Sequence, residues 1–93
     1  MYPSVKKDIA IILDKDITAD EISKVIKKAG GNLLINQEMF DVYTNAILGD
    51  RKSVAYSLTF GSNSKTLTDE EINPVLEKII EALEKNLNAE LRK

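Results

Sequence analysis

The chain has 93 residues, with 13 Lys or Arg against 15 Asp or Glu, no histidine and no cysteine. This length suits one small domain, and a hydrophobic fraction of 43% is ordinary for a soluble globular protein. The missing cysteines exclude disulfides and thiolate metal sites, and the missing histidines exclude the usual base of hydrolytic triads. No stretch is long and apolar enough for a signal peptide or membrane span, so we expect a cytoplasmic protein.

The first half of the chain predicts a strand, a helix and a second strand. Residues 5–13 alternate apolar and polar side chains, which is typical of a strand. Thr18 and Glu21 have the spacing of a capping box, and Gly30-Gly31 supplies a C-terminal stop, so a helix lies between them. A strand-like run follows over residues 32–43, with a bulge or bend expected at the polar pair Asn36-Gln37.

The second half repeats this order. Residues 53–60 alternate cleanly and predict a strand after a hairpin loop. Thr68 and Glu71 form a second capping-box pattern, followed by a broad apolar stripe that predicts a helix. Pro74 lies beyond the first turn of that helix, so we expect a kink or a late start. Residues 88–92 predict a short last strand, with Ala89 and Leu91 pointing inward.

This order of elements predicts the fold class. Strand, helix, strand, strand, helix, strand is the ferredoxin-like βαββαβ sandwich, an α+β fold with a four-stranded antiparallel sheet and two helices on one face. The side chains expected to face the helices are Val5, Ile9, Ile11, Phe40, Val42, Val54, Tyr56 and Leu58. Met39, Asp41 and Tyr43 fall on the other side of their strand.

The uncovered face of this sheet is the predicted binding surface. It would carry Ala10, Asp41, Tyr43, Ser53 and Ala55, from three neighbouring strands. An aromatic ring, a carboxylate acceptor, a hydroxyl and small side chains together suit an unpaired nucleobase. Two structural alternatives stand beside this interpretation: Tyr43 shields the rim of the core, and Asp41 pairs with Arg51 or Lys52 across the hairpin.

Five sequence blocks are characteristic of this chain; in chain order they are YPSVKKDIA (2–10), KAGG (28–31), FDVY (40–43), KSVAYSLTF (52–60) and TLTDEEIN (66–73). Together with the closing NAELRK, they resemble the C-terminal ferredoxin-fold anticodon-binding domain of bacterial phenylalanyl-tRNA synthetase beta subunits. They follow the order of that family and span nearly the whole chain. The resemblance implies that residues 1–93 form a single domain that is a piece of a larger beta subunit.

The resemblance also implies a role. Such a domain is not catalytic and needs no cofactor; it contacts the anticodon of phenylalanine tRNA, while the rest of an α2β2 ligase uses ATP and Mg elsewhere. The first anticodon base stacks on the tyrosine that corresponds to Tyr43. Asp41, Ala10 and Ser53 correspond to other contact residues of the family, and Ala55 joins them by register alone. Where the family usually has arginine, this chain has Lys7 and Lys65, which keep the charge but not the bidentate fork.

Two further expectations concern function. The acidic residues are concentrated at the end of the chain, where residues 66–93 hold seven of the 15 Asp or Glu but only four of the 13 Lys or Arg. We therefore expect the domain alone to bind RNA weakly. The alternative function is a free-standing ferredoxin-like domain that senses a small molecule or binds another protein, for example by dimerising through its sheet.

Overall fold

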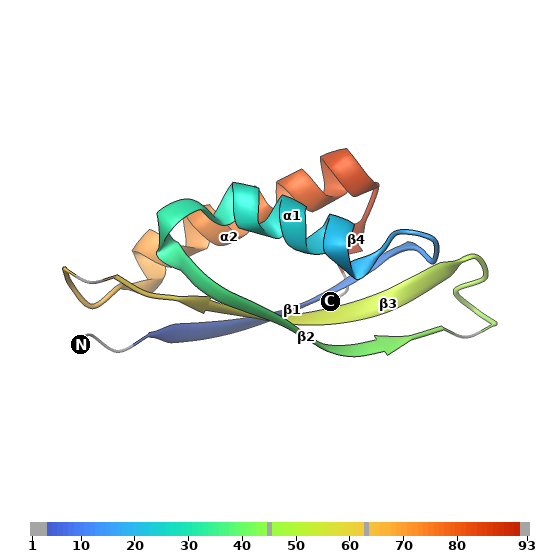
Figure 1. Ribbon diagram of the computed structural model, residues 1–93, viewed down its shortest axis with the longest axis horizontal. Coiled ribbons are helices and arrows are strands. Elements are labelled where there is room, and N and C mark those ends of the chain that lie inside the picture. The colour runs from blue at the N-terminus through green and yellow to red at the C-terminus, as the bar shows by residue number, and fades with distance from the viewer. Residues whose placement is uncertain (1–3, 45, 63, 92–93) are drawn as a thin grey trace.

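The computed structural model describes residues 4–44, 46–62 and 64–91. Its elements, in chain order, are β1 (Val5–Asp14), α1 (Ala19–Gly30), a short 3-10 helix η1 (Gly31–Leu33), β2 (Leu34–Tyr43), β3 (Arg51–Phe60), α2 (Asp69–Leu87) and β4 (Glu90–Leu91). The strands form one antiparallel sheet in the order β2-β3-β1-β4. Both helices lie on the same side of this sheet (Figure 1). The predicted ferredoxin-like α+β fold is confirmed.

The core lies between the sheet and the helices. Ile9, Ile11 and Leu13 of β1 are buried, and so are Val54, Tyr56, Leu58 and Phe60 of β3. They pack with the apolar stripes of the two helices, which contribute Ile22, Ile26, Ile72, Ile79 and Leu83. Tyr56 is 1% exposed, and its hydroxyl donates to the carbonyl of Ala19 at 3.4 Å. The aromatic side chains of β3 therefore belong to the core, as their register predicts.

The two helices begin differently. Thr18 caps α1 through its hydroxyl, which accepts from the Glu21 N–H at 3.2 Å, while the Glu21 carboxylate accepts from the Thr18 N–H at 3.1 Å. The first predicted capping box is thus confirmed. Thr68 precedes α2, but its side chain makes no capping hydrogen bond. The second box is wrong because Glu71 turns instead to Lys65, with 3.0 Å between carboxylate and ammonium.

Pro74 lies inside α2, which begins directly after Thr68. Of the two predicted outcomes, the late start is therefore wrong, and the kink stays a prediction. Proline cannot donate to the carbonyl four residues earlier, which is that of Glu70. Pro74 and Glu70 are both exposed, so water can donate a hydrogen bond to the Glu70 carbonyl and lower the free-energy cost of the missing helical hydrogen bond.

Strand β2 departs most from the prediction. Its register against β3 shifts twice, between Leu34 and Asn36 and between Met39 and Asp41. The first irregularity lies one residue before the predicted bulge, and the second was not predicted. The second shift places Met39 opposite the core residue Tyr56, on the helix side of the sheet, whereas the simple alternation had put it with Asp41.

Phe40 and Val42 were predicted to be core residues, and this is wrong. Their side chains are 58% and 44% exposed. Phe40 is skipped by the pairing at the second bulge, while Val42 lies opposite Val54 on the helix side but has no helix above it. The physical reason is that β2 is an edge strand whose second half runs clear of both helices (Figure 1).

The last strand is shorter than predicted. β4 comprises only Glu90 and Leu91, and Arg92 lies outside the described residues. Ala89 is buried and Leu91 packs on the core, so their inward orientation is confirmed. Arg51 anchors this end: its guanidinium lies 3.3 Å from the Glu90 carboxylate and donates to the carbonyl of Asn88 at 2.9 Å and that of Ile12 at 3.1 Å.

Candidate nucleic-acid interface

The open face of the sheet is the candidate site, and its geometry follows from strand register. Residues directly opposite each other on neighbouring strands point to the same side of a sheet. Ala55 of β3 lies opposite Asp41 of β2 and Ala10 of β1, forming one row across three strands. These side chains point away from the helices, because their chain neighbours Val54 and Tyr56 point into the core.

A second row lies beside the first. Ser53 of β3 is opposite Tyr43 of β2 and Ile12 of β1. The five residues predicted as a binding surface thus occupy two adjacent rows on one uncovered face. We call these two rows the platform: Asp41, Ala55, Ala10, Tyr43, Ser53 and Ile12. Rows in a sheet are about 7 Å apart, so the platform is wide enough for a base and its ribose.

The members of the platform differ in accessibility. Asp41 is exposed, and Tyr43, Ala10 and Ala55 are half-buried. Ser53 is only 4% exposed, although no helix covers it. It is a short side chain, and by register its two cross-strand neighbours, Tyr43 and Ile12, are larger. Its hydroxyl therefore lies at the floor of the platform, not at its surface.

Ile12 is the platform residue that sequence reasoning missed. The strand pattern of residues 5–13 assigns Ile12 to the polar face, where an isoleucine is out of place. An apolar side chain on this otherwise polar face was the sequence feature that could have identified Ile12 as part of the platform. In the structure Ile12 is half-buried and gives the platform an aliphatic wall on the side opposite Tyr43.

Neither predicted partner of Asp41 is available to it. Arg51 is held by Glu90 and two backbone carbonyls, as described above. The ammonium of Lys52 donates to the carbonyl of Ile17 on the helix side. Among the described residues Asp41 has no ion pair within 4 Å, so its carboxylate is an available acceptor at the edge of the platform.

The described part of the open face is acidic. By register its charged residues within that part are Lys6, Asp8, Asp14, Glu38, Asp41, Arg51 and Glu90. Five of these seven are carboxylates, and Arg51 is already paired with Glu90. The surface is therefore suited to the N–H donors of bases much better than to phosphates.

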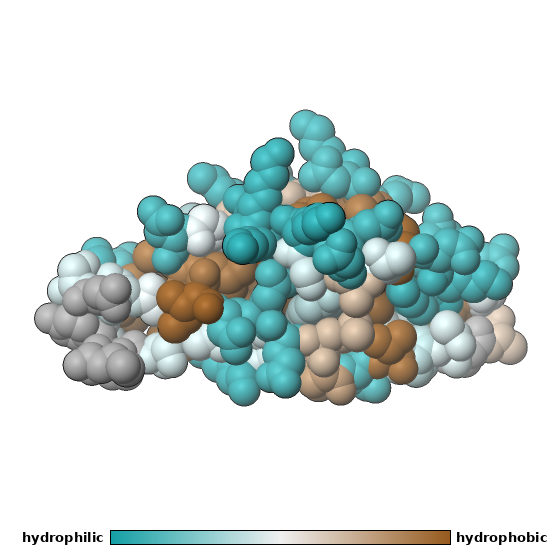
Figure 2. Space-filling view, in the orientation of Figure 1, coloured by the Kyte–Doolittle hydropathy of each residue, from teal (hydrophilic) through white to brown (hydrophobic). Residues whose placement is uncertain are grey.

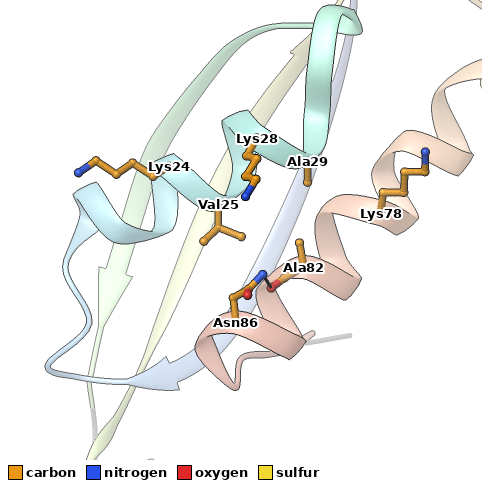
Figure 3. A pocket seen from close by; sticks show the side chains of 7 residues that line it. All are labelled: Lys24, Val25, Lys28, Ala29, Lys78, Ala82 and Asn86. Carbon is orange, nitrogen blue, oxygen red and sulfur yellow. Dashed lines mark hydrogen bonds between the residues drawn. The ribbon is translucent and has the colours of Figure 1, made fainter.

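Lysines gather instead on the opposite side of the molecule. A groove of about 620 Å³ lies between α1 and α2, with Val25, Ala29 and Ala82 as its floor. Figure 3 shows Lys24, Lys28 and Lys78 around it, on the helix layer. Lys24 is paired with Asp20 at 3.1 Å. The lining of the groove contains no acidic side chain, and the groove shares no residue with the platform.

Two other lysines fix the start of α2. Lys7 lies 3.2 Å from the carboxylate of Asp69, and Lys65 pairs with Glu71. These are the two positions at which the resembling family usually has arginine. Here both ammonium groups serve contacts within the domain.

No group of three or more metal-binding side chains occurs within the described ranges. Neither helix there is long and apolar enough to cross a bilayer.

Comparison with known families identifies the domain. Residues 1–92 match the model of the ferredoxin-fold anticodon binding domain. The chain belongs to this family.

Relatives of known sequence add a more specific likeness. The chain is 42% identical over 92 residues to the phenylalanine–tRNA ligase beta subunit of Listeria monocytogenes and 47% identical to that of Carboxydothermus hydrogenoformans. The alignments cover 98% of this chain but only 12% of each relative. The anticodon-binding domain thus spans about an eighth of the proteins it matches.

Proposed function

We propose that this anticodon-binding domain holds the anticodon of phenylalanine tRNA on the open face of its sheet. The observation that carries the proposal is the adjacency of Tyr43, Ser53 and Asp41 in two rows that no helix covers. The ring of Tyr43 supplies a stacking surface, worth about 1–3 kcal/mol per base. Asp41 accepts hydrogen bonds from the N–H groups of the stacked base, and Ala10 and Ala55 let it approach the sheet.

The domain works as a recognition module and takes no part in the chemistry. Its parent is a phenylalanine–tRNA ligase beta subunit, like the relatives it matches. This parent subunit acts with an alpha subunit in an α2β2 assembly in the cytoplasm. ATP and Mg are used by the catalytic part of that enzyme. The acidic open face leaves most phosphate contacts to other parts of the assembly, so the isolated domain binds RNA weakly.

The test is a titration of the 15N-labelled chain with the anticodon stem-loop of phenylalanine tRNA, followed by NMR. We expect the amide shifts to change at Asp41, Tyr43, Ser53 and their neighbours on β1, with little change on the helices. A stem-loop that lacks the first anticodon base is the matched control and should produce smaller changes there. Shifts confined to the lysine groove between α1 and α2 would contradict the proposal.

A further inference from the structure

The open face extends along β3 beyond the two rows of the platform. From Ser53 onward the open-face side chains of this strand are small, in the order Ser53, Ala55, Ser57 and Thr59. Apart from Ala10, the side chains that lie opposite them on β2 and β1 are larger. The middle of the open face is therefore a shallow track that leads away from the platform along one strand.

Ser57 is the unusual member of this track. It is 6% exposed, and its hydroxyl oxygen is buried without a hydrogen-bond partner among the described residues. Buried hydroxyls are normally hydrogen-bonded, because leaving one unpaired costs free energy. By register the Ser57 side chain points to the open face, where Asp8 and Glu38 lie directly opposite it.

Asp8 and Glu38 complete the surroundings of Ser57. They lie on β1 and β2, so their backbones are separated by two strand spacings, or about 10 Å. Both side chains are exposed, and neither has an ion pair with a described residue. The row Glu38, Ser57 and Asp8 thus has a carboxylate at each side and an unpaired hydroxyl at the floor. We call this row the acceptor row.

We propose that the acceptor row is a second base subsite, which takes the exocyclic amine of the nucleotide next to the one on the platform. The inference rests on the proposed function, because the row directly adjoins the row of Asp41, Ala55 and Ala10. An amino group that enters the gap can give its hydrogens to the carboxylates and to the Ser57 oxygen. Rotation of the exposed Asp8 and Glu38 side chains opens the way to that oxygen.

The same arrangement selects among bases. Cytosine and adenine present an amine at the position where uracil presents a carbonyl oxygen. A carbonyl directed between two carboxylates can accept only from the Ser57 hydroxyl and meets like partial charge on both sides, so it is disfavoured relative to an amine. The carboxylates also repel phosphate, which keeps the RNA backbone over the edge of the sheet and directs the base inward.

The experiment compares dinucleotides that differ only in this group. The 15N-labelled chain is titrated with ApC against ApU, and with CpA against UpA to cover both strand directions. We expect shifts on the platform with every dinucleotide. For one of the two strand directions we also expect shifts at Asp8, Glu38 and Ser57. In that direction the dinucleotide with cytosine should bind about fivefold more tightly than the one with uracil, because one net hydrogen bond contributes about that factor.

Two variants sharpen the test. Ser57→Ala removes a hydroxyl that has no partner among the described residues, so the variant should fold normally and lose part of the preference for cytosine. Asp8→Asn combined with Glu38→Gln should lower the preference further. Glu77→Gln, an exposed carboxylate on α2, is the matched control and should leave it unchanged.

The outcomes separate the two proposals. Shifts on the platform without a cytosine preference would overturn the second subsite and leave the proposed function standing. Absence of shifts everywhere would overturn both. The last measurement is a titration with Mn²⁺ alone. If the amide signals of Asp8, Glu38 and Ser57 broaden specifically and Mg²⁺ reverses the broadening, the row is a cation site and the base subsite is overturned.

Discussion

Tyr43 and Ser53 are direct partners across β2 and β3, so their side chains lie next to each other on the uncovered face of the sheet. This pairing joins two parts of the platform on which the proposed function depends, the tyrosine ring and the buried serine. It depends on the β2 register, which the bulge between Met39 and Asp41 sets. A change in that register would separate the two side chains without altering either residue.

The stacking role of Tyr43 predicts a specific pattern of substitutions. Tyr43→Phe keeps the ring and should bind the anticodon stem-loop nearly as well, whereas Tyr43→Leu should lose about 1–3 kcal/mol of binding free energy. Isothermal titration calorimetry measures both, and circular dichroism checks that both variants fold. Equal affinities for the leucine variant and the unmodified chain would refute stacking.

The salt dependence of binding should be shallow. Each phosphate neutralised on a single strand contributes about 0.7 to the slope of log K against log salt. Among the described residues the open face has only Lys6 and Arg51 as cations by register, so the slope for binding there should not exceed about 1.4 in magnitude. Fluorescence anisotropy at several salt concentrations gives this slope. A steep slope would place the RNA on the lysine-rich helix layer instead.

The two helix starts make a matched pair for stability. Thr18→Ala removes a side chain that accepts from the Glu21 N–H, so it should lower the free energy of unfolding by about 1 kcal/mol. Thr68→Ala removes a side chain with no capping bond and should cost clearly less. Urea unfolding followed by circular dichroism compares them. Equal losses would mean that Thr68 caps α2 in solution.

Gly30 should not tolerate a larger side chain. A β-carbon at this position would lie 2.6 Å from the Cβ and Cδ2 atoms of Leu34, far inside van der Waals contact. Gly30→Ala must therefore displace the start of β2, and should cost about 1–3 kcal/mol of stability. Lys27→Ala, an exposed change on the same helix, is the control for helix propensity. A thermal melt of Gly30→Ala that matches this control would contradict the close approach.

Arg51 should control the end of the chain. Its guanidinium binds two carbonyls and Glu90, so Arg51→Ala should release β4 while the rest of the sheet stays folded. Hydrogen exchange at the Leu91 amide measures this release, and protection within β1 and β3 is the internal reference. Arg51→Lys should behave more like alanine than like arginine, because lysine lacks the planar fork.

The sequence predicted the fold because its local signals agree with one another. The clean alternation of β3 and the capping box at Thr18 each report a structure that neighbouring residues alone determine. The open-face placement of Asp41 and Tyr43 was also predictable, since period-two alternation survives between them. Whether these residues bind RNA stays a prediction.

The failures have a common cause in tertiary arrangement. Phe40 and Val42 carry the apolar pattern of a core strand, but their exposure depends on where β2 lies in the sheet and on how far the helices reach. Glu71 has the spacing of a capping box, yet Lys65 offers a competing charge that the local pattern does not weigh. Neither effect is visible in a window of neighbouring residues.

The two bulges in the edge strand β2 affect the tendency of the domain to aggregate. Large apolar side chains are exposed along this strand and the loop after it, at Ile35, Met39, Phe40, Val42 and Ile47. Figure 2 shows apolar patches on the side of the molecule where β2 runs. A flat edge strand of this composition would pair with other chains and promote aggregation. The two bulges in β2 oppose such pairing, because they break the regular spacing of the outward N–H and C=O groups.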